Sequence, residues 1–222
     1  MSKITTNDGL SQGSNYFRFE DSLGFMWITG NDAVNRYDGS RVKVYNLNKY
    51  FLNCPNLSQG YGFAEDNLTN IYIGSTNGLY IYNRNQDKFT LHKVYVGKDQ
   101  TAMPIAFKNG KIWCYNKRFE LITFDVQTKK TTSFGKLPLP EMKSIHVYDL
   151  GSNTFYFRFP FLVDETIWFV DANQVLTYNI KTKKIQFPLK AFTDKVDLSF
   201  YQACYDKKSR SVFIVCSDEI IK

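Results

Sequence analysis

The sequence predicts an all-β chain built from repeated four-stranded antiparallel units, which is the architecture of a β-propeller. Bulky aromatic residues recur at intervals of 45, 41, 55 and 45 residues, at Trp27, Tyr72, Trp113, Trp168 and Phe213. A second aromatic residue follows each of the first four about ten positions later, and Asp or Asn follows it directly. With 17% aromatic residues, the 222-residue chain is rich in strand formers. Strand-rich repeats of about 40 to 50 residues are typical of propeller blades.

Four complete blades and a partial fifth are expected within a single propeller segment, residues 1–222. Their approximate bounds are 9–46, 57–92, 103–134, 155–187 and 198–222. In blade one, four runs alternate with a period of two and are separated by Asp and Gly turns. These runs are Tyr16–Glu20, Phe25–Thr29, Val34–Tyr37 and Val42–Tyr45.

Blade two repeats this order, with strands expected at Tyr61–Glu65, Ile71–Gly74, Leu79–Tyr82 and Phe89–His92. Its acid pair Glu65-Asp66 stands where Glu20-Asp21 stands in blade one. Recurrence favours a structural role, in which the Asp caps the turn between the first two strands, over a catalytic pair. Gly78, in the next loop, is suited to a positive φ.

The later blades are less regular. Asn109-Gly110 between alternating runs is a strong hairpin signal in blade three. The strands expected there are Ile105–Lys108, Lys111–Tyr115, Leu121–Asp125 and Thr131–Phe134. Those of blade four are Phe155–Phe159, Thr166–Val170, Val175–Tyr178 and Lys184–Phe187, with Ile145–Leu150 as an extra strand. Blade five holds Leu198–Tyr205, Val212–Cys216 and a possible third strand at Glu219–Lys222.

The last repeat breaks off early, which allows two interpretations. The chain could be a compact ring of about five blades, in which Lys3–Thr6 supplies a missing outer strand. It could instead be a fragment of a larger propeller, of about seven blades. The fragment is the favoured interpretation, because the chain stops within a repeat and a propeller protects its edges by closing.

Composition excludes few classes of protein. The net charge is +7, and basic pairs such as Lys129-Lys130 and Lys183-Lys184 lie between predicted strands. We expect such turns to spread the charge around a solvated rim, which disfavours nucleic acid as a partner. The four cysteines form no CxxC pair, and free core cysteines are expected. No run is apolar enough to span a bilayer, and no signal peptide is recognisable in the sequence.

Signals of catalysis are weak, so the chain is not expected to be an enzyme. His92 and His146 are the only histidines and belong to different repeats. No phosphate loop, dinucleotide fingerprint, zinc motif or nucleophile elbow occurs, so no cofactor and no metal are expected. The recurrent large aromatic residues are interpreted as packing between blades rather than as a stacking surface for sugars or bases.

A binding site would come from the loops between second and third strands and between blades, which share one face of a propeller. The candidate ligand-binding residues are Asn31, Asp32, Tyr61, Thr76, Asn77, Lys117, Arg118, Asp171 and Asn173. Arg118 and Tyr61 are the preferred contacts.

Blades one and two resemble the two-component regulator propeller repeat. Blade one supplies Gly9-Leu10-Ser11, Glu20-Asp21, Trp27-Ile28-Thr29 and Asn35-Arg36-Tyr37-Asp38. Blade two supplies Leu57-Ser58, Glu65-Asp66, Tyr72-Ile73-Gly74 and Asn77-Gly78-Leu79. Ala33 and Asn116-Lys117-Arg118 depart from the pattern, and blades three to five keep little beyond the aromatic residues.

The resemblance implies the periplasmic or extracytoplasmic sensor region of a Bacteroidetes-type hybrid histidine kinase. The function expected is non-catalytic sensing of an oligosaccharide or other small ligand, with signalling through a homodimer and no direct membrane contact by this segment. The first alternative is a protein-interaction scaffold, which would expose an apolar patch on the same face. The second is a propeller polysaccharide lyase or glycosidase, which would need acid and base residues converging from several blades.

Overall fold

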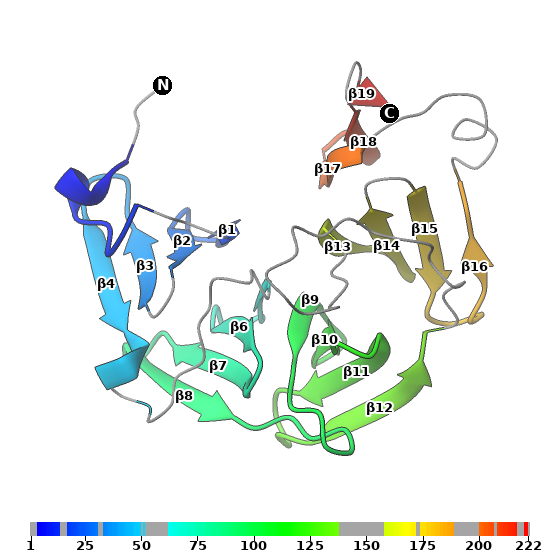
Figure 1. Ribbon diagram of the computed structural model, residues 1–222, viewed down its shortest axis with the longest axis horizontal. Helices are drawn as coiled ribbons and strands as arrows, with labels where there is room; N and C mark the ends of the chain where they lie inside the picture. The colour runs from blue at the N-terminus through cyan, green and yellow to red at the C-terminus, as the bar shows by residue number, and fades with distance from the viewer. Residues whose placement is uncertain are drawn as a thin grey trace, which may run out of the picture. The chain divides into compact units, whose positions relative to one another are not determined.

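In a computed structural model, the secondary structure of the described residues consists of antiparallel strands and two short 3-10 helices (Figure 1). The structure describes residues 4–13, 17–30, 33–49, 51, 62–137, 158–171, 174–188, 200–206, 208–216 and 220–221. The chain divides into two compact units, Met1–Lys136 and Leu137–Lys222. Each unit consists of sheets whose strands follow one another in chain order. Four sheets have four strands and one has three, so the predicted β-propeller of four blades and a partial fifth is confirmed.

The first unit holds blades one to three. Blade one consists of β1 (Phe17–Glu20), β2 (Met26–Thr29), β3 (Ala33–Tyr37) and β4 (Val42–Asn46). Blade two consists of β5 (Phe63–Glu65), β6 (Ile71–Ser75), β7 (Gly78–Asn83) and β8 (Lys88–His92). Blade three consists of β9 (Met103–Lys108), β10 (Lys111–Tyr115), β11 (Glu120–Asp125) and β12 (Thr131–Lys136). The predicted Asn109-Gly110 hairpin is confirmed, because both residues have a positive φ between β9 and β10.

The second unit holds the remaining two sheets. Blade four consists of β13 (Arg158–Val163), β14 (Thr166–Asp171), β15 (Gln174–Asn179) and β16 (Ile185–Gln186). The partial blade five consists of β17 (Phe200–Asp206), β18 (Ser211–Cys216) and β19 (Ile220–Ile221). Cys204 lies opposite Phe213 and Cys216 opposite Phe200, so the two cysteines do not occupy opposite positions in the hairpin. The extra strand expected at Ile145–Leu150 lies outside the described residues.

Two strand predictions were wrong. The first strand of blade four continues to Val163, four residues beyond its predicted end at Phe159. Its register shifts between Arg158 and Phe161, so Pro160 lies at an irregularity, which is where a strand tolerates proline. The segment proposed as an outer strand, Lys3–Thr6, is not one in its described part: Thr6 begins the 3-10 helix η1 (Thr6–Asp8). Thr5 and Asp8 close a capping box there, which satisfies the helix start locally.

The turns are closed by Asp and Asn side chains, as the recurrent acids predicted. Asp21 Oδ1 accepts hydrogen bonds from the backbone amides of Leu23 and Phe25, at 3.0 and 2.9 Å. Asp66 Oδ1 does the same for Leu68 and Asn70, both at 2.9 Å. These carboxylates therefore cap the turns between the first and second strands of blades one and two, which confirms their predicted role.

The large aromatic residues of blades one and two pack between blades. Trp27 is fully buried, and its ring centroid lies 4.8 Å from that of Tyr82 in blade two. Tyr72 is buried against Phe124 of blade three, with centroids 6.1 Å apart. The packing interpretation is confirmed for these two residues. Neither described helix, η1 nor η2 (Leu47–Lys49), has the length of a membrane span.

A third aromatic residue, Trp113, lacks the polar partner that its equivalents have. Trp27 Nε1 donates to Asp21 Oδ2 at 2.8 Å, and the Tyr72 hydroxyl donates to Asp66 Oδ2 at 2.9 Å. Each acid lies six positions before its aromatic residue. In blade three the two-residue turn leaves no acid there, and Trp113 Nε1 is buried without a hydrogen-bond partner.

This difference predicts unequal costs for the same substitution. Trp27→Phe removes a hydrogen bond that the native structure contains, whereas Trp113→Phe removes a buried donor that has no partner. We expect Trp27→Phe to lower the free energy of unfolding by about 1–2 kcal/mol more than Trp113→Phe does. Urea denaturation of both variants measures the difference, and equal losses would contradict the assigned hydrogen bond.

Candidate functional site

The loops predicted to bind a ligand lie at one end of the strands of blades two and three. In an antiparallel sheet, loops after the second strand and after the fourth strand leave from the same end. We call this end the loop edge, and it comprises residues 75–78, 93–102, 116–120 and Lys136. The backbone amide of Ala102 donates to the Ser75 carbonyl at 3.1 Å, and Met103 pairs with Tyr115. The turn after β6 and the loop after β10 are therefore two strand spacings apart, a distance of about 10 Å.

The turn that carries Thr76 and Asn77 is tightly braced. The Ser75 hydroxyl donates to the Gly78 carbonyl at 2.9 Å and accepts from the Asn77 amide at 3.1 Å. Ser75 is buried, whereas Thr76 is exposed and Asn77 is half-buried. The turn therefore presents one polar side chain fully to solvent on a rigid support.

The loop that carries Lys117 and Arg118 is braced by Asn116. Asn116 is buried, and its Oδ1 accepts from the backbone amides of Arg118 and Glu120 at 2.9 and 3.0 Å. Its Nδ2 donates to Glu120 Oε2 at 2.6 Å, so the neighbouring carboxylate is turned toward the loop backbone. Lys117 and Arg118 remain exposed. A fixed backbone with two exposed cations is suited to holding an anionic or polar group.

The connection from β8 to β9 completes the loop edge and was not among the predicted contacts. Val96 and Asp99 exchange backbone hydrogen bonds around a short turn. Asp99 Oδ1 accepts from the Thr101 amide at 2.9 Å, whereas Asp99 Oδ2 and Thr101 Oγ1 are buried without partners. Tyr95 is 56% exposed, and Lys93 and Lys98 are also exposed. Counting the charged residues of each blade in the sequence would have identified this basic connection as a candidate contact.

The described part of blades two and three does not include the other predicted contacts. Asn31, Asp32, Tyr61 and Asn173 lie outside the described residues. Asp171 is the last residue of β14, in the second unit, where its backbone pairs with Gln174. Thr76, Asn77, Lys117 and Arg118 are therefore the predicted contacts that the structure places on one edge.

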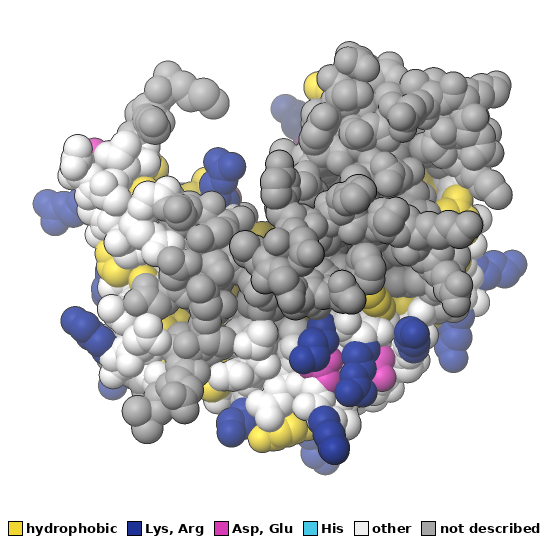
Figure 2. Space-filling view, viewed as in Figure 1, with side chains coloured by type: hydrophobic (Ala, Val, Ile, Leu, Met, Phe, Trp, Pro, Cys, Tyr) yellow, Lys and Arg dark blue, Asp and Glu magenta, His cyan; other side chains and the backbone are white. Residues whose placement is uncertain are grey.

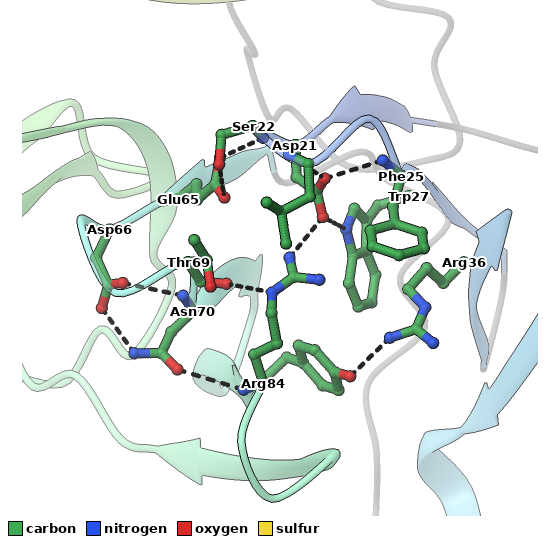
Figure 3. Close-up of polar contacts among 12 residues, drawn as sticks. Asp21, Ser22, Phe25, Trp27, Arg36, Glu65, Asp66, Thr69, Asn70 and Arg84 are labelled. Carbon is green, nitrogen blue, oxygen red and sulfur yellow. Dashed lines mark hydrogen bonds and ion pairs between the residues drawn. The ribbon is translucent and has the colours of Figure 1, made fainter. Parts of the chain in front are cut away.

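The opposite edge of blades one and two carries a buried polar network (Figure 3). Arg84, in the turn after β7, reaches from blade two to blade one and pairs with Asp21 through Nη2 and Oδ2 at 2.5 Å. The Asp21 side chain is fully buried, and that of Arg84 is 15% exposed. Arg84 Nε also donates to the Thr69 carbonyl at 3.0 Å, which holds the guanidinium in place. Glu65 accepts from the Ser22 amide and hydroxyl at 2.8 and 2.7 Å, which adds a second contact between the blades.

A second group of side chains extends this network. Asp87 Oδ1 accepts from the hydroxyls of Tyr45 and Tyr82, both at 2.7 Å, and Asp87 also pairs with Lys43. Burial, followed by the bonds to Tyr82 and Asp87, raises the pKa of Tyr45. Burial works to raise the pKa of Asp87, but hydrogen bonds from Lys43 and both tyrosines outweigh it and lower that pKa. Both groups hold one protonation state at neutral pH, so this network is a structural join between the blades.

The remaining titratable groups of note do not converge on a site. Burial and the charge of Lys129 lower the pKa of His92, whose ring lies 4.7 Å from that of Phe124. The Cys114 thiol is buried and free, and burial raises its pKa. Within the described part of the chain, no three His, Cys, Asp or Glu residues are grouped to hold a metal ion.

Comparison with solved structures shows the same fold. Two extracellular domains of hybrid two-component systems from B. thetaiotaomicron match 96% and 99% of this chain, with TM-scores of 0.60 and 0.63 and identities of 20% and 14%. A surface component of the type-IX secretion system of Porphyromonas gingivalis matches 99%, with a TM-score of 0.63 and 16% identity. The chain spans 26%, 30% and 33% of the lengths of these structures. No protein-family model and no curated protein sequence matches. The predicted resemblance is therefore confirmed at the level of the β-propeller fold.

Proposed function

We propose that this chain is a non-catalytic, ligand-sensing propeller segment of a two-component signalling receptor that acts outside the cytoplasm. It recognises a glycan-derived ligand through the loop edge of blades two and three. The observation that carries the proposal is the loop edge itself, where braced loops hold Thr76, Lys117 and Arg118 at the surface. Similarity in fold to extracellular domains of two-component systems supports the choice of a sensor.

Signalling by such a segment needs no chemistry of its own. A ligand shifts an equilibrium only when it binds one arrangement of the receptor more tightly than another. We propose that the ligand favours one arrangement of a homodimer, which the rest of the receptor transmits. The rigid support of the loops suits this role, because binding energy is not spent on ordering the site.

A second candidate function is a protein-interaction scaffold, and one observation favours it. Leu23 and Leu68 are 56% and 70% exposed and stand at equivalent positions of the first turns of blades one and two. These turns lie at the edge opposite the loop edge, and not on the face where the scaffold alternative was expected to expose an apolar patch. A protein partner would therefore use the leucine-bearing edge, whereas a sugar would use the polar one.

Oligosaccharide binding tests the proposal. We expect isothermal titration calorimetry with neutral and acidic tetrasaccharides to show that at least one of them binds, with one site per chain. Arg118→Ala should weaken that binding about tenfold, because it removes a charge-assisted hydrogen bond at the loop edge. Arg41→Ala, an exposed arginine in the last turn of blade one, should leave it unchanged. Binding of extended peptides with no saccharide binding, abolished by Leu68→Ser, would favour the scaffold.

A further inference from the structure

We infer that the loop edge binds an anionic saccharide, one that carries carboxylate or sulfate groups. This inference rests on the proposed function and names its class of ligand. It starts from the distribution of charge along the chain. Residues 93–136 contain nine Lys and Arg residues and three Asp and Glu residues, a net charge of +6, whereas the whole chain carries +7.

The positive charge therefore belongs to blade three and the connection that leads into it. Elsewhere in the chain acidic residues balance the basic ones almost completely, so the excess of positive charge falls in this part of the sequence. In Figure 2, Lys and Arg side chains, in dark blue, lie over the part of the molecule that β9–β12 occupy in Figure 1, with Asp and Glu side chains, in magenta, among them; other Lys and Arg side chains lie over blade one.

Five of the nine cations lie at the loop edge. They are Lys93, Lys98, Lys117, Arg118 and Lys136, and all five are exposed. Two ion pairs of the described residues, Lys43 with Asp87 and Arg84 with Asp21, lie in blades one and two. None of the five cations has a carboxylate partner within the described structure.

The two carboxylates at this edge do not neutralise it. Glu120 Oε2 is engaged by Asn116 Nδ2 at 2.6 Å, and Asp99 is buried beneath the connection. Glu120 accepts from the Asn116 side chain and Asp99 Oδ1 accepts from the Thr101 amide, and these neutral donors leave both negative charges in place. Five cations and two carboxylates leave the loop edge with a net charge of +3, and it attracts an anion.

Among the described residues of the loop edge, one exposed aromatic residue, Tyr95, stands between Lys93 and Lys98 in the sequence. An amphipathic ring beside cations can contact the apolar face of a sugar while the ammonium groups meet its acidic substituents. Binders of single-stranded nucleic acid stack successive bases on several aromatic residues, and duplex binders make about six to ten phosphate contacts. A single ring and five cations on short loops fit a short acidic saccharide better.

Calorimetric titration at low and high salt tests the inference. The probes are tetragalacturonate, a chondroitin sulfate tetrasaccharide, neutral maltotetraose and a dT8 oligonucleotide. We expect one or both acidic saccharides to bind at least about tenfold more tightly than the neutral one. That preference should fall when NaCl is raised from about 50 to about 500 mM, because salt screens exposed charges. The two acidic probes distinguish carboxylate from sulfate as the recognised group.

A matched pair of variants separates a local site from a general effect of charge. Lys117→Ser with Arg118→Ser removes two cations from the loop edge, beside the cap of Asn116. Lys129→Asn with Lys130→Ser removes two from the opposite edge of blade three, beside the cap of Asp125. Asn tolerates the positive φ of Lys129. We expect the first variant to weaken acidic saccharide binding about tenfold and the second to leave it within twofold, with both retaining the wild-type circular dichroism and melting temperature.

Several results would overturn the inference. These are equal losses in both variants, tighter binding of dT8 than of either acidic saccharide, and no binding of an acidic saccharide. If maltotetraose binds as tightly as the acidic probes, the sensor proposal stands and the anionic preference fails. If no saccharide binds, both fail together.

Discussion

Asp21→Ala should lower the free energy of unfolding of the first unit by about 3–5 kcal/mol, because it leaves a buried cation without its partner. Asp21 Oδ2 accepts from Arg84 Nη2 at 2.5 Å and from Trp27 Nε1 at 2.8 Å. Its Oδ1 caps the turn through the Leu23 and Phe25 amides. One substitution therefore removes four hydrogen bonds and the charge that compensates the guanidinium. Urea denaturation followed by tryptophan fluorescence measures the loss.

Removing the cation as well should recover part of this loss. In Asp21→Ala with Arg84→Met, no unpaired charge remains at the join, so the double variant should be more stable than Asp21→Ala alone. The Leu23 and Phe25 amides would still lack their cap, so recovery should be incomplete. The single variant Arg84→Met completes the comparison. If the stability loss of the double variant equals the sum of the losses of the two single variants, Asp21 and Arg84 are not coupled.

The same contact gives this prediction a pH dependence. Burial alone would raise the pKa of Asp21, but hydrogen bonds from Trp27, Arg84 and the Phe25 amide outweigh it and lower the pKa. A carboxyl group with a lowered pKa stabilises the fold above its unfolded-state pKa of about 4. That stabilisation is lost as the pH falls through the folded-state pKa. The difference in the free energy of unfolding between wild type and Asp21→Ala should therefore be largest at pH 7 and decrease below about pH 4.

Gly78→Ala should destabilise the first unit by about 3 kcal/mol, through backbone strain and a steric clash together. Gly78 has a φ of 123°, and a Cβ atom there would lie 2.2 Å from the His92 carbonyl oxygen. The oxygen belongs to the neighbouring strand β8, so it cannot turn away as a side chain could. Relief would require β7 and β8 to separate at the loop edge. Thermal and urea denaturation should both show the loss.

A second glycine isolates the contribution of the clash. Gly97 also has a positive φ, of 61°, but a Cβ atom there would meet nothing within 4 Å. Gly97→Ala should therefore show the strain alone, about 1 kcal/mol. Similar losses for Gly78→Ala and Gly97→Ala would mean that the close approach to His92 has no energetic weight. Gly78→Ala should also weaken ligand binding at the loop edge, since Gly78 closes the turn that carries Thr76 and Asn77.

The sequence alone determined the local structure of this protein. Alternation with a period of two, interrupted by Asp, Asn and Gly turns, placed the strands of blades one to three to within a few residues. The role of Asp21 and Asp66 as turn caps was also readable, because a capping hydrogen bond reaches an amide only two to four residues away. Burial of Trp27 and Tyr72 followed from one bulky residue recurring at one strand position.

Only the tertiary structure decided what these residues meet in other parts of the chain. Arg84 lies 63 residues from Asp21 in sequence, and nothing local shows that they pair. The shift in register at Pro160 and the capping box that makes Thr6 helical likewise depend on geometry that alternation does not record. Lys93, Lys117 and Lys136 are separated in sequence and share the loop edge because the connection and the strands of blade three end there. Turns and alternation act over a few residues, whereas contacts between blades arise when strands distant in sequence pack together.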